Sequence, residues 1–561
     1  MDHNTNMETG DWLARDEAAR EYVVGATQEV KSLLASTYGP RGSTALVQTV
    51  DGQQVPETVV TADAGCLLDA IERGDGFVHP IAALFVDGLD SVRRGLHDGT
   101  TATALLAAGL VEEGARLSEA GVHEETVTVG YAMAANRAGE VLDDLAQTIT
   151  PTDRGRLRQV AETTMTTDLS ASHRDAYADV VSAAVAKLAA SSEGQWFDTD
   201  DISVRTRVGE EVEPVRGHVI RRRPGAHETS EKSRLSFDWT PSVDGTLEDA
   251  RIAVLDRDID VEETAINFGS NDGATVSLDS AESVMAYTAA HTSAIDDVAA
   301  SIADLGVDVL VVRAELDDAV KNAIQAQGVA VVDRAQYPKS DIHRVARATG
   351  AQVVGHVSGL DESKIGRAGR VTEQRVGEEK WTTIEECEGP VFTIIVETPT
   401  EQGRTAHERI VEDAVETTSI AAIDGQVLPG AGAAPLAVAR DLRQFARGVR
   451  GKEQLAIEAF ADVCESLVQT LARNAGYDPL DVLASVRTAH TDAATTPAPL
   501  GFDVSVGEPA DAWEMGVVEP RRVFSQALDS AVATSEQLST IDAVVSPGID
   551  LDELDPQTEH G

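Results

Sequence analysis

An Asp-Gly-Thr-Thr run at residues 98–101 lies between two apolar stretches whose residue spacing predicts helices, over about residues 79–96 and 101–118. The N-terminus of a helix attracts phosphate, because its backbone N–H groups are unpaired and the helix dipole is positive there. A carboxylate beside it would repel the phosphate unless Mg²⁺ lay between the two anions. The run therefore predicts a magnesium–phosphate site at Asp98, although an isolated run of this kind more often contains only a helix cap.

The composition limits the number of domains and the class of partner. The 561 residues are too many for one hydrophobic core and predict about two to four domains. The 95 acidic and 46 basic residues give a formal net charge of −49, which argues against nucleic acid and against an anionic membrane as partners. Few aromatic residues and many carboxylates are typical of proteins from salt-loving archaea.

The cysteines and the N-terminal segment indicate a cytoplasmic protein. Cys66, Cys387 and Cys464 are far apart in the sequence and form no CxxC pair, so neither a disulfide framework nor a zinc site is expected. Residues 1–10 are polar and acidic and contain no apolar signal-peptide region. No apolar run approaches the about 20 residues that a membrane-spanning helix needs.

The pattern along the chain predicts helix-rich segments on either side of an α/β block. Helical spacing is present over about residues 12–35 and 123–148 and again after Pro399. Residues 217–385 instead contain short apolar runs such as 252–255, separated by helical stretches, which predicts a sheet with some parallel pairing. We therefore expect discontinuous domains with an insertion.

Four turns that contain glycine stand out, at residues 39–42, 63–65, 98–101 and 430–432. Two of them carry a carboxylate, Asp63 and Asp98, and a third carboxylate, Asp413, lies about 17 residues before the last turn. Glycine lets the backbone approach a phosphate closely. Carboxylates that converge can hold Mg²⁺ and orient water, as phosphoryl transfer to water requires.

In this order and spacing the turns resemble those of group II chaperonins, the thermosomes of archaea and their eukaryotic cytosolic relatives. The resemblance covers about residues 15–548. It rests on the runs YGPRG at 38–42, TADAGCLL at 61–68, HPIA at 79–82, HDGTT at 97–101, GAGA at 430–433, GKEQLAIEAFA at 451–461, LARNAG at 471–476 and GVVEP at 516–520.

The resemblance implies a multidomain α and α/β fold. A helix-rich equatorial ATPase domain would comprise residues 1–150 and 425–549, and an intermediate hinge domain residues 151–216 and 386–424. Residues 217–385 would form an α/β apical domain with a helical protrusion as a built-in lid, and residues 550–561 a disordered acidic tail.

The resemblance also implies a function, that of an ATP-dependent chaperonin subunit. Such a subunit forms a double ring with the same or related chains and encloses unfolded client proteins when ATP binding and hydrolysis close the lid. The cofactors would be ATP and Mg²⁺. Carried over by position, Asp98 would ligate Mg²⁺, and Asp63 and Asp413 would flank the γ-phosphate and position the attacking water. The residues implied to bind the nucleotide are Tyr38, Gly39, Pro40, Asp98, Gly99, Thr100, Thr101, Gly430, Ala431, Gly432 and Glu519.

Several positions depart from the family pattern. Ala62 replaces an Asn, and Ala64, His97 and Ala431 replace glycines. Asp168 aligns with a family Lys that senses the γ-phosphate, and a carboxylate near a triphosphate costs several kcal/mol at low dielectric unless a cation compensates. These changes favour an alternative function, a divergent subunit with weak or no ATPase and a structural or regulatory role in mixed rings. The three carboxylates favour hydrolysis. We interpret His97 as a polar turn residue rather than a metal ligand.

We expect this chain to lose stability in dilute buffer. Lowering KCl from about 1 M to about 0.1 M lengthens the Debye length from about 3 Å to about 10 Å, so the surplus carboxylates repel one another more strongly. Thermal unfolding at the two salt concentrations measures the effect. A midpoint that does not fall on lowering KCl would contradict the halophilic interpretation.

Overall fold

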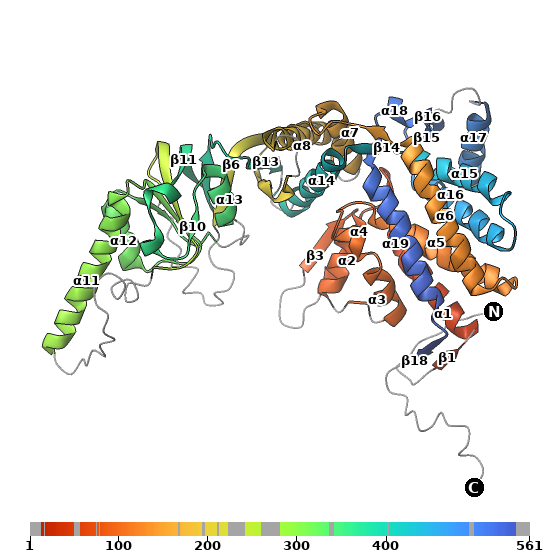
Figure 1. The fold of residues 1–561 in the computed structure, drawn as a ribbon, viewed down its shortest axis with the longest axis horizontal. Helices are drawn as coiled ribbons and strands as arrows, with labels where there is room; N and C mark the ends of the chain where they lie inside the picture. The colour runs from red at the N-terminus through yellow and green to blue at the C-terminus, as the bar shows by residue number, and fades with distance from the viewer. Residues whose placement is uncertain are drawn as a thin grey trace, which may run out of the picture. The chain divides into compact units, whose positions relative to one another are not determined.

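The structure is a computed structural model. It describes residues 13–15, 17–49, 57–74, 76–77, 79–165, 169–192, 197–209, 212–222, 242–259, 281–335, 341–377, 379–398, 400, 403–492 and 499–545. The chain divides into two compact units, unit 1 with residues 1–182 and 413–561 and unit 2 with residues 183–412 (Figure 1). Asp168 and the acidic tail lie outside the described residues.

Unit 1 is built mainly of helices from both ends of the chain. They are α1 (Glu17–Ala35), α2 (Ala64–Arg73), α3 (Pro80–Asp87), α4 (Asp90–Arg93), α5 (Thr100–Glu119), α6 (Glu124–Leu145), α7 (Arg154–Thr164), α15 (Ala433–Ala446), α16 (Glu453–Asn474), α17 (Pro479–Asp492), α18 (Ala512–Met515) and α19 (Arg521–Ser539). Two more helices, α8 (Ala171–Ser191) and α14 (Arg404–Asp424), contain residues of both units.

Four small antiparallel sheets accompany these helices. They pair β1 (Leu13–Arg15) with β18 (Ala543–Val545), β2 (Ala45–Thr49) with β3 (Glu57–Thr61), β14 (Gln426–Pro429) with both β4 (Gln147–Thr148) and β17 (Val518–Pro520), and β15 (Leu500–Asp503) with β16 (Glu508–Asp511).

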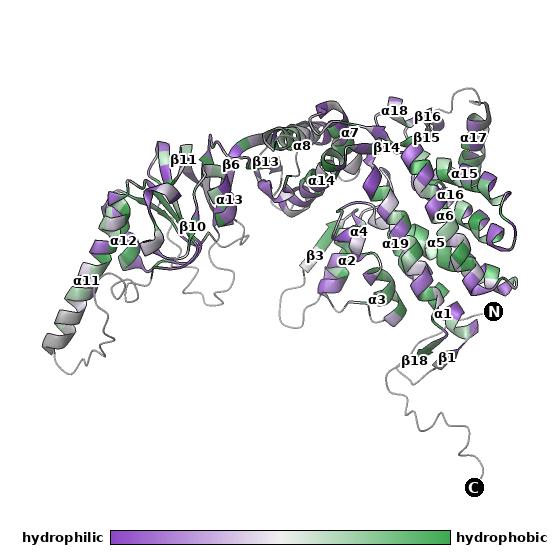
Figure 2. Ribbon diagram, in the orientation of Figure 1, coloured by the Kyte–Doolittle hydropathy of each residue, from purple (hydrophilic) through white to green (hydrophobic). Residues whose placement is uncertain are grey.

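Helix α5 is the centre of the core of unit 1. Its residues from Ala104 to Val111 are all buried, so this helix is apolar on every side and must be surrounded by other elements. It packs against α1, α16 and α19, and Phe460 of α16 meets Tyr131 of α6 edge to face. Figure 2 shows polar and apolar residues alternating along α19, as expected for a helix with one buried side. The core thus joins segments from both chain ends, and it fixes the start of α5 in space.

Unit 2 contains a nine-stranded mixed sheet with the order β5-β13-β6-β12-β11-β7-β8-β9, and β10 pairs with β7. The strands are β5 (Ile202–Val208), β6 (Val212–Arg222), β7 (Thr246–Leu255), β8 (Val309–Val312), β9 (Ala330–Val332), β10 (Val353–Val354), β11 (Gly366–Val376), β12 (Glu379–Glu385) and β13 (Phe392–Thr398). The helices are α11 (Ala281–Asp304), α12 (Asp318–Ala326) and α13 (Asp341–Thr349), with short 3-10 turns at Thr199–Asp201, Val357–Gly359 and Glu362–Lys364.

Helices cover both faces of this sheet at β8. Val309 and Val311 belong to an apolar cluster that includes α13, whereas Leu310 and Val312 belong to a second cluster that includes α11 and α12. Alternate side chains of a strand point to opposite faces, so a strand buried on both sides has a continuous apolar sequence. The predicted α/β block with parallel pairing is confirmed, because β7 pairs in parallel with β8 and β10, and β8 pairs in parallel with β9.

The first turns of α11 stand away from the sheet of unit 2 (Figure 1). Met285 on this part of the helix is 74% exposed. Nowhere in the described ranges is there a helix of the length and apolar character that crossing a lipid bilayer requires.

Unit 2 also contains a buried polar network. The carboxylate of Asp341 is fully buried and accepts hydrogen bonds from His218 Nε2 at 2.8 Å and from Arg205 Nη2 at 3.0 Å. Burial lowers the pKa of His218, although the charge of Asp341 partly opposes the change. The folded state therefore holds this imidazole neutral at a pH where an exposed histidine begins to take up a proton.

We predict that His218 makes the chain less stable as pH falls. The unfolded chain binds a proton at His218 below about pH 6.5 and the folded chain resists it, so stability decreases below that pH. His218→Gln has no titrating ring and should lose less stability than wild type between about pH 7.5 and 5.5. Guanidinium unfolding at constant high KCl measures how the free energy of unfolding of each protein changes with pH. The same change in both proteins would contradict the prediction.

Candidate nucleotide site

The Asp98 turn links α4 to α5. The Asp98 carboxylate accepts a hydrogen bond from Gly99 N at 2.6 Å, and Gly99 has a φ of +83°. A Cβ atom on Gly99 would lie 2.9 Å from Val523 Cγ1, so only glycine fits the close approach of α19 here. Thr100 and Thr101 are the first two residues of α5. The turn therefore places Asp98 beside the positive N-terminus of a 20-residue helix.

The turn at residues 38–42 follows α1 and lies next to the start of α5. Thr37 Oγ1 is 3.4 Å from Thr101 Oγ1. Asn474 at the end of α16 donates hydrogen bonds of 2.8 Å to the carbonyls of Ala35 and Tyr38. The turn, which includes Gly39 and the exposed Pro40, is thus tied to both α5 and α16.

A third turn joins β14 to α15 and contains Gly430, Ala431 and Gly432. Gly432 has a φ of +77°, and a Cβ atom there would meet Val468 of α16 at 2.6 Å. The pairing of β14 with β17 sets Leu428 opposite Glu519, so this acidic residue lies beside the turn. Ala431 has a φ of +54°, which is strained for any residue with a Cβ atom.

Asp63 and Asp413 come from two further elements. Asp63 follows β3 as the N-cap of α2 and accepts a hydrogen bond from Cys66 N at 2.6 Å. Asp413 lies on α14, with Oδ1 at 3.3 Å from Nδ1 of His97. The departures at Ala62 and Ala64 are both buried small residues beside this turn.

The pKa values indicate that these carboxyl groups converge. The pKa of Asp98 is raised to about 6, mainly by burial and also by the charges of Asp63 and Asp413, while the hydrogen bond from Gly99 N opposes the change. Burial and the charge of Asp98 raise the pKa of Glu519 to about 8. Burial, Glu519 and Asp98 also raise the pKa of Tyr38. Such values are characteristic of functional sites, where like charges are gathered against their mutual repulsion.

The described residues include no group of three or more His, Cys, Asp or Glu side chains arranged to hold a metal ion by themselves. Proteins usually bind Mg²⁺ through one or two carboxylates together with substrate phosphates and water. Asp98 at the α5 N-terminus has the right chemistry for such a shared site, because α2, α5 and α15 all begin at these turns and their N-terminal N–H groups favour phosphate.

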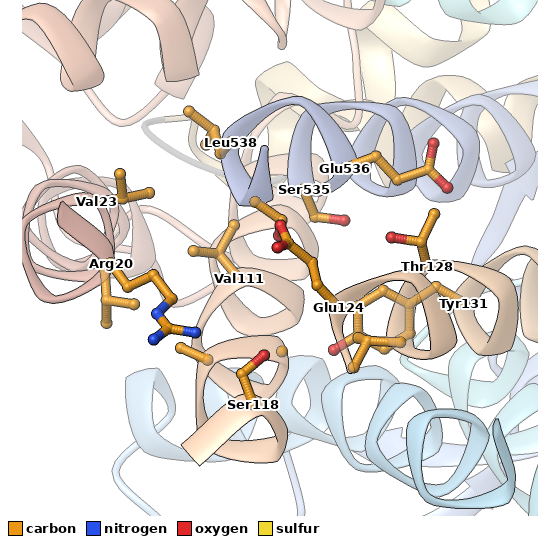
Figure 3. Close-up of a pocket in the computed structure, with 15 residues that line it drawn as sticks. Arg20, Val23, Val111, Ser118, Glu124, Thr128, Tyr131, Ser535, Glu536 and Leu538 are labelled. Atoms are coloured by element: carbon orange, nitrogen blue, oxygen red, sulfur yellow. The ribbon is translucent and has the colours of Figure 1, made fainter. Parts of the chain in front are cut away.

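A separate cavity of about 30 Å³ lies between α1, α5, α6 and α19. Figure 3 shows Arg20, Glu124, Tyr131 and Glu536 around it. Its volume suits a water molecule or two rather than a nucleotide. None of the residues of the carboxylate cluster lines it.

His97 lies in the turn between α4 and α5, in agreement with its interpretation as a polar turn residue. Sequence reasoning missed the contact of its imidazole with Asp413, the carboxylate implied to position water. The available signal was the replacement of a family glycine directly before Asp98, because a residue with a side chain in that position needs a compensating contact.

A helical unit made from both chain ends, an α/β unit inserted between them and a carboxylate cluster beside helix N-termini together have the form expected of a chaperonin subunit. The model of the TCP-1/cpn60 chaperonin family matches residues 30–548, and the chain belongs to this family. The predicted resemblance to group II chaperonins is thereby confirmed.

Known proteins similar to this chain are archaeal thermosome subunits. A thermosome subunit of Methanopyrus kandleri is 34% identical over 540 residues, which cover 95% of this chain and 93% of that protein. Thermosome subunit 1 of Haloferax volcanii is 32% identical, over 94% of this chain and 89% of that protein. Thermosome subunit alpha of Halobacterium salinarum is 31% identical, over 95% of this chain and 89% of that protein.

We predict that Glu519→Gln stabilises the nucleotide-free protein increasingly as pH rises. Folded Glu519 keeps its proton up to about pH 8, whereas the unfolded residue loses it near 4.5. Wild type therefore loses stability between these pH values, and glutamine, which mimics the neutral acid, does not. Unfolding of both proteins at about pH 5, 6.5 and 8 should show that the free energy of unfolding of Glu519→Gln exceeds that of wild type by an amount that grows with pH to about 1–3 kcal/mol. An advantage that is the same at all three values would contradict this.

Proposed function

We propose that this chain is an ATP-hydrolysing subunit of a double-ring chaperonin that binds and encloses unfolded protein. The main support for this proposal is that the charges of Asp63 and Asp413 act on Asp98, beside the N-termini of α2 and α5. Asp413 is more than 300 positions from both Asp63 and Asp98 in the sequence, and a common electrostatic environment for the three is expected of a nucleotide site. The similarity to thermosome subunits supports the assembly with the same or related chains.

In the proposed site each group has a separate task. The turns at residues 38–40, 99–101 and 430–432 bind and orient the phosphates and the nucleoside through backbone N–H groups. Glu519 borders the adenosine. Asp98 would hold Mg²⁺, which would supply positive charge to offset the negative charge of the phosphates. Asp63 and Asp413 accept hydrogen bonds from the attacking water and orient it toward the γ-phosphate.

The proposal extends to the domains. Residues 1–150 and 425–549 would act as the equatorial ATPase domain, residues 151–216 and 386–424 as the hinge, and residues 217–385 as the client-binding apical domain with α11 in its lid. Asp413 would then couple hydrolysis to closure, because α14 belongs to the hinge. A ligand drives such closure only if its affinity differs between the open and closed states.

We predict that Asp413→Ala separates hydrolysis from binding. Loss of a group that orients water should lower kcat for ATP about 100-fold or more, with nucleotide affinity changed by less than about threefold. Asp98→Asn should instead weaken binding of the magnesium–nucleotide complex. Steady-state ATPase and equilibrium binding on assembled rings in high KCl measure both effects.

The control is Glu140→Ala, which removes an exposed carboxylate that pairs with Arg137 on the surface of α6 and should leave both quantities unchanged. Equal turnover in wild type and Asp413→Ala would remove the role assigned to Asp413. A wild-type protein that is inactive alone, and that gives active rings only with a second subunit, would support the regulatory alternative instead.

A further inference from the structure

His97 has a backbone conformation that disfavours side chains. Its φ is +57°, in the left-handed region, and it is one of five residues other than glycine with positive φ in the described part of the chain. Two of these five, His97 and Ala431, lie in the turns of the candidate nucleotide site. Such a conformation costs about 1 kcal/mol or more for a residue with a Cβ atom, and it persists only where other contacts offset the cost.

The contact that accompanies this conformation is with Asp413. His97 Nδ1 lies 3.3 Å from Asp413 Oδ1, and the Asp413 side chain is only 16% exposed. The imidazole is 42% exposed, so part of the ring remains open to solvent. A glycine at position 97 would be relaxed in the same backbone conformation but has no atom that could reach Asp413.

Apolar residues close to this contact join α14 to the turn that contains His97. One apolar cluster contains Leu96, Ile420 of α14, Val92 of α4 and Val523 of α19. Asp413 precedes Ile420 by seven residues, or two helical turns, so both lie on the side of α14 that faces the Asp98 turn. His97 therefore adds a polar contact at one end of an apolar contact already present between α14 and the turn.

We propose that His97 is a positioning residue for Asp413. With Nδ1 as donor, it fixes the rotamer of the carboxylate so that this group faces the water to be activated. The inference rests on the proposed function of Asp413. It also explains why the turn tolerates a strained residue directly before the proposed magnesium ligand.

The test compares His97→Gly with His97→Asn and with wild type. His97→Gly removes the imidazole and relaxes the backbone, so the variant should fold and assemble with an unchanged or higher unfolding midpoint. Without its positioning contact the carboxylate samples other rotamers, so kcat should fall about tenfold while KM and nucleotide affinity stay within about twofold. Asparagine tolerates positive φ and can still donate a hydrogen bond, so His97→Asn should recover at least about half of kcat.

Two further variants make the outcomes distinct. Glu386→Gly makes the same relaxing change at a φ of +58° in unit 2 and should leave ATPase unchanged. In Asp413→Ala the imidazole has no carboxylate to orient, so adding His97→Gly should lower kcat no further. If adding His97→Gly to Asp413→Ala lowered kcat by about a further tenfold, His97 would act independently of Asp413, and the proposal would be overturned.

A kcat for His97→Gly equal to wild type, with Asp413→Ala still inactive, would also overturn the positioning role and leave the proposed function intact. Equal turnover of wild type and Asp413→Ala would instead reject the function on which it rests.

Discussion

The repulsion among the carboxylates of the candidate nucleotide site is the constraint that the rest of unit 1 must satisfy. Asp98 lies close enough to Asp63, Asp413 and Glu519 for their charges to act on one another, and burial raises the pKa of both Asp98 and Glu519. Left alone, these groups would move apart toward water. They stay together because each is attached to an element that the hydrophobic core holds in place. The nucleotide-free site is therefore a region of stored electrostatic energy, which a bound cation would release.

The core supplies the restraint through α5 and its neighbours. Because α5 is buried on every side, its N-terminus is fixed by packing against helices from both chain ends. Two of the turns are held close to these helices, because Gly99 lies against Val523 and Gly432 lies against Val468. Asn474 ties the first turn to α16 through two backbone carbonyls. Hydrophobic packing determines where the charges lie, and the charges determine what the site attracts.

Ala431 and His97, which have side chains in turns where the resemblance implies glycine, do not prevent these turns from packing against the helices. Ala431 keeps a left-handed backbone conformation, and its carbonyl accepts a hydrogen bond from Phe502 N at 2.9 Å, which holds the strained turn in place. His97 keeps such a conformation as well, with its side chain turned to Asp413. Both turns thus have a left-handed conformation at a residue with a side chain, and contacts with more distant elements offset the local strain.

Local patterns in the sequence were sufficient for the element types and for the family. The continuous apolar run of β8 indicated a strand covered on both faces, and the hydroxyl-rich start of α5 indicated a helix N-terminus beside Asp98, since both signals depend only on neighbouring residues. The contact of His97 with Asp413 could not be predicted in this way, because the two residues are more than 300 positions apart. Tertiary packing brings them together, because Leu96 beside His97 and Ile420 on α14 belong to one apolar cluster. The sequence by itself determined which chemical groups this chaperonin chain carries and the type of element beside each. The tertiary structure decided which of those groups meet, because that depends on how α14 and α19 pack around α5.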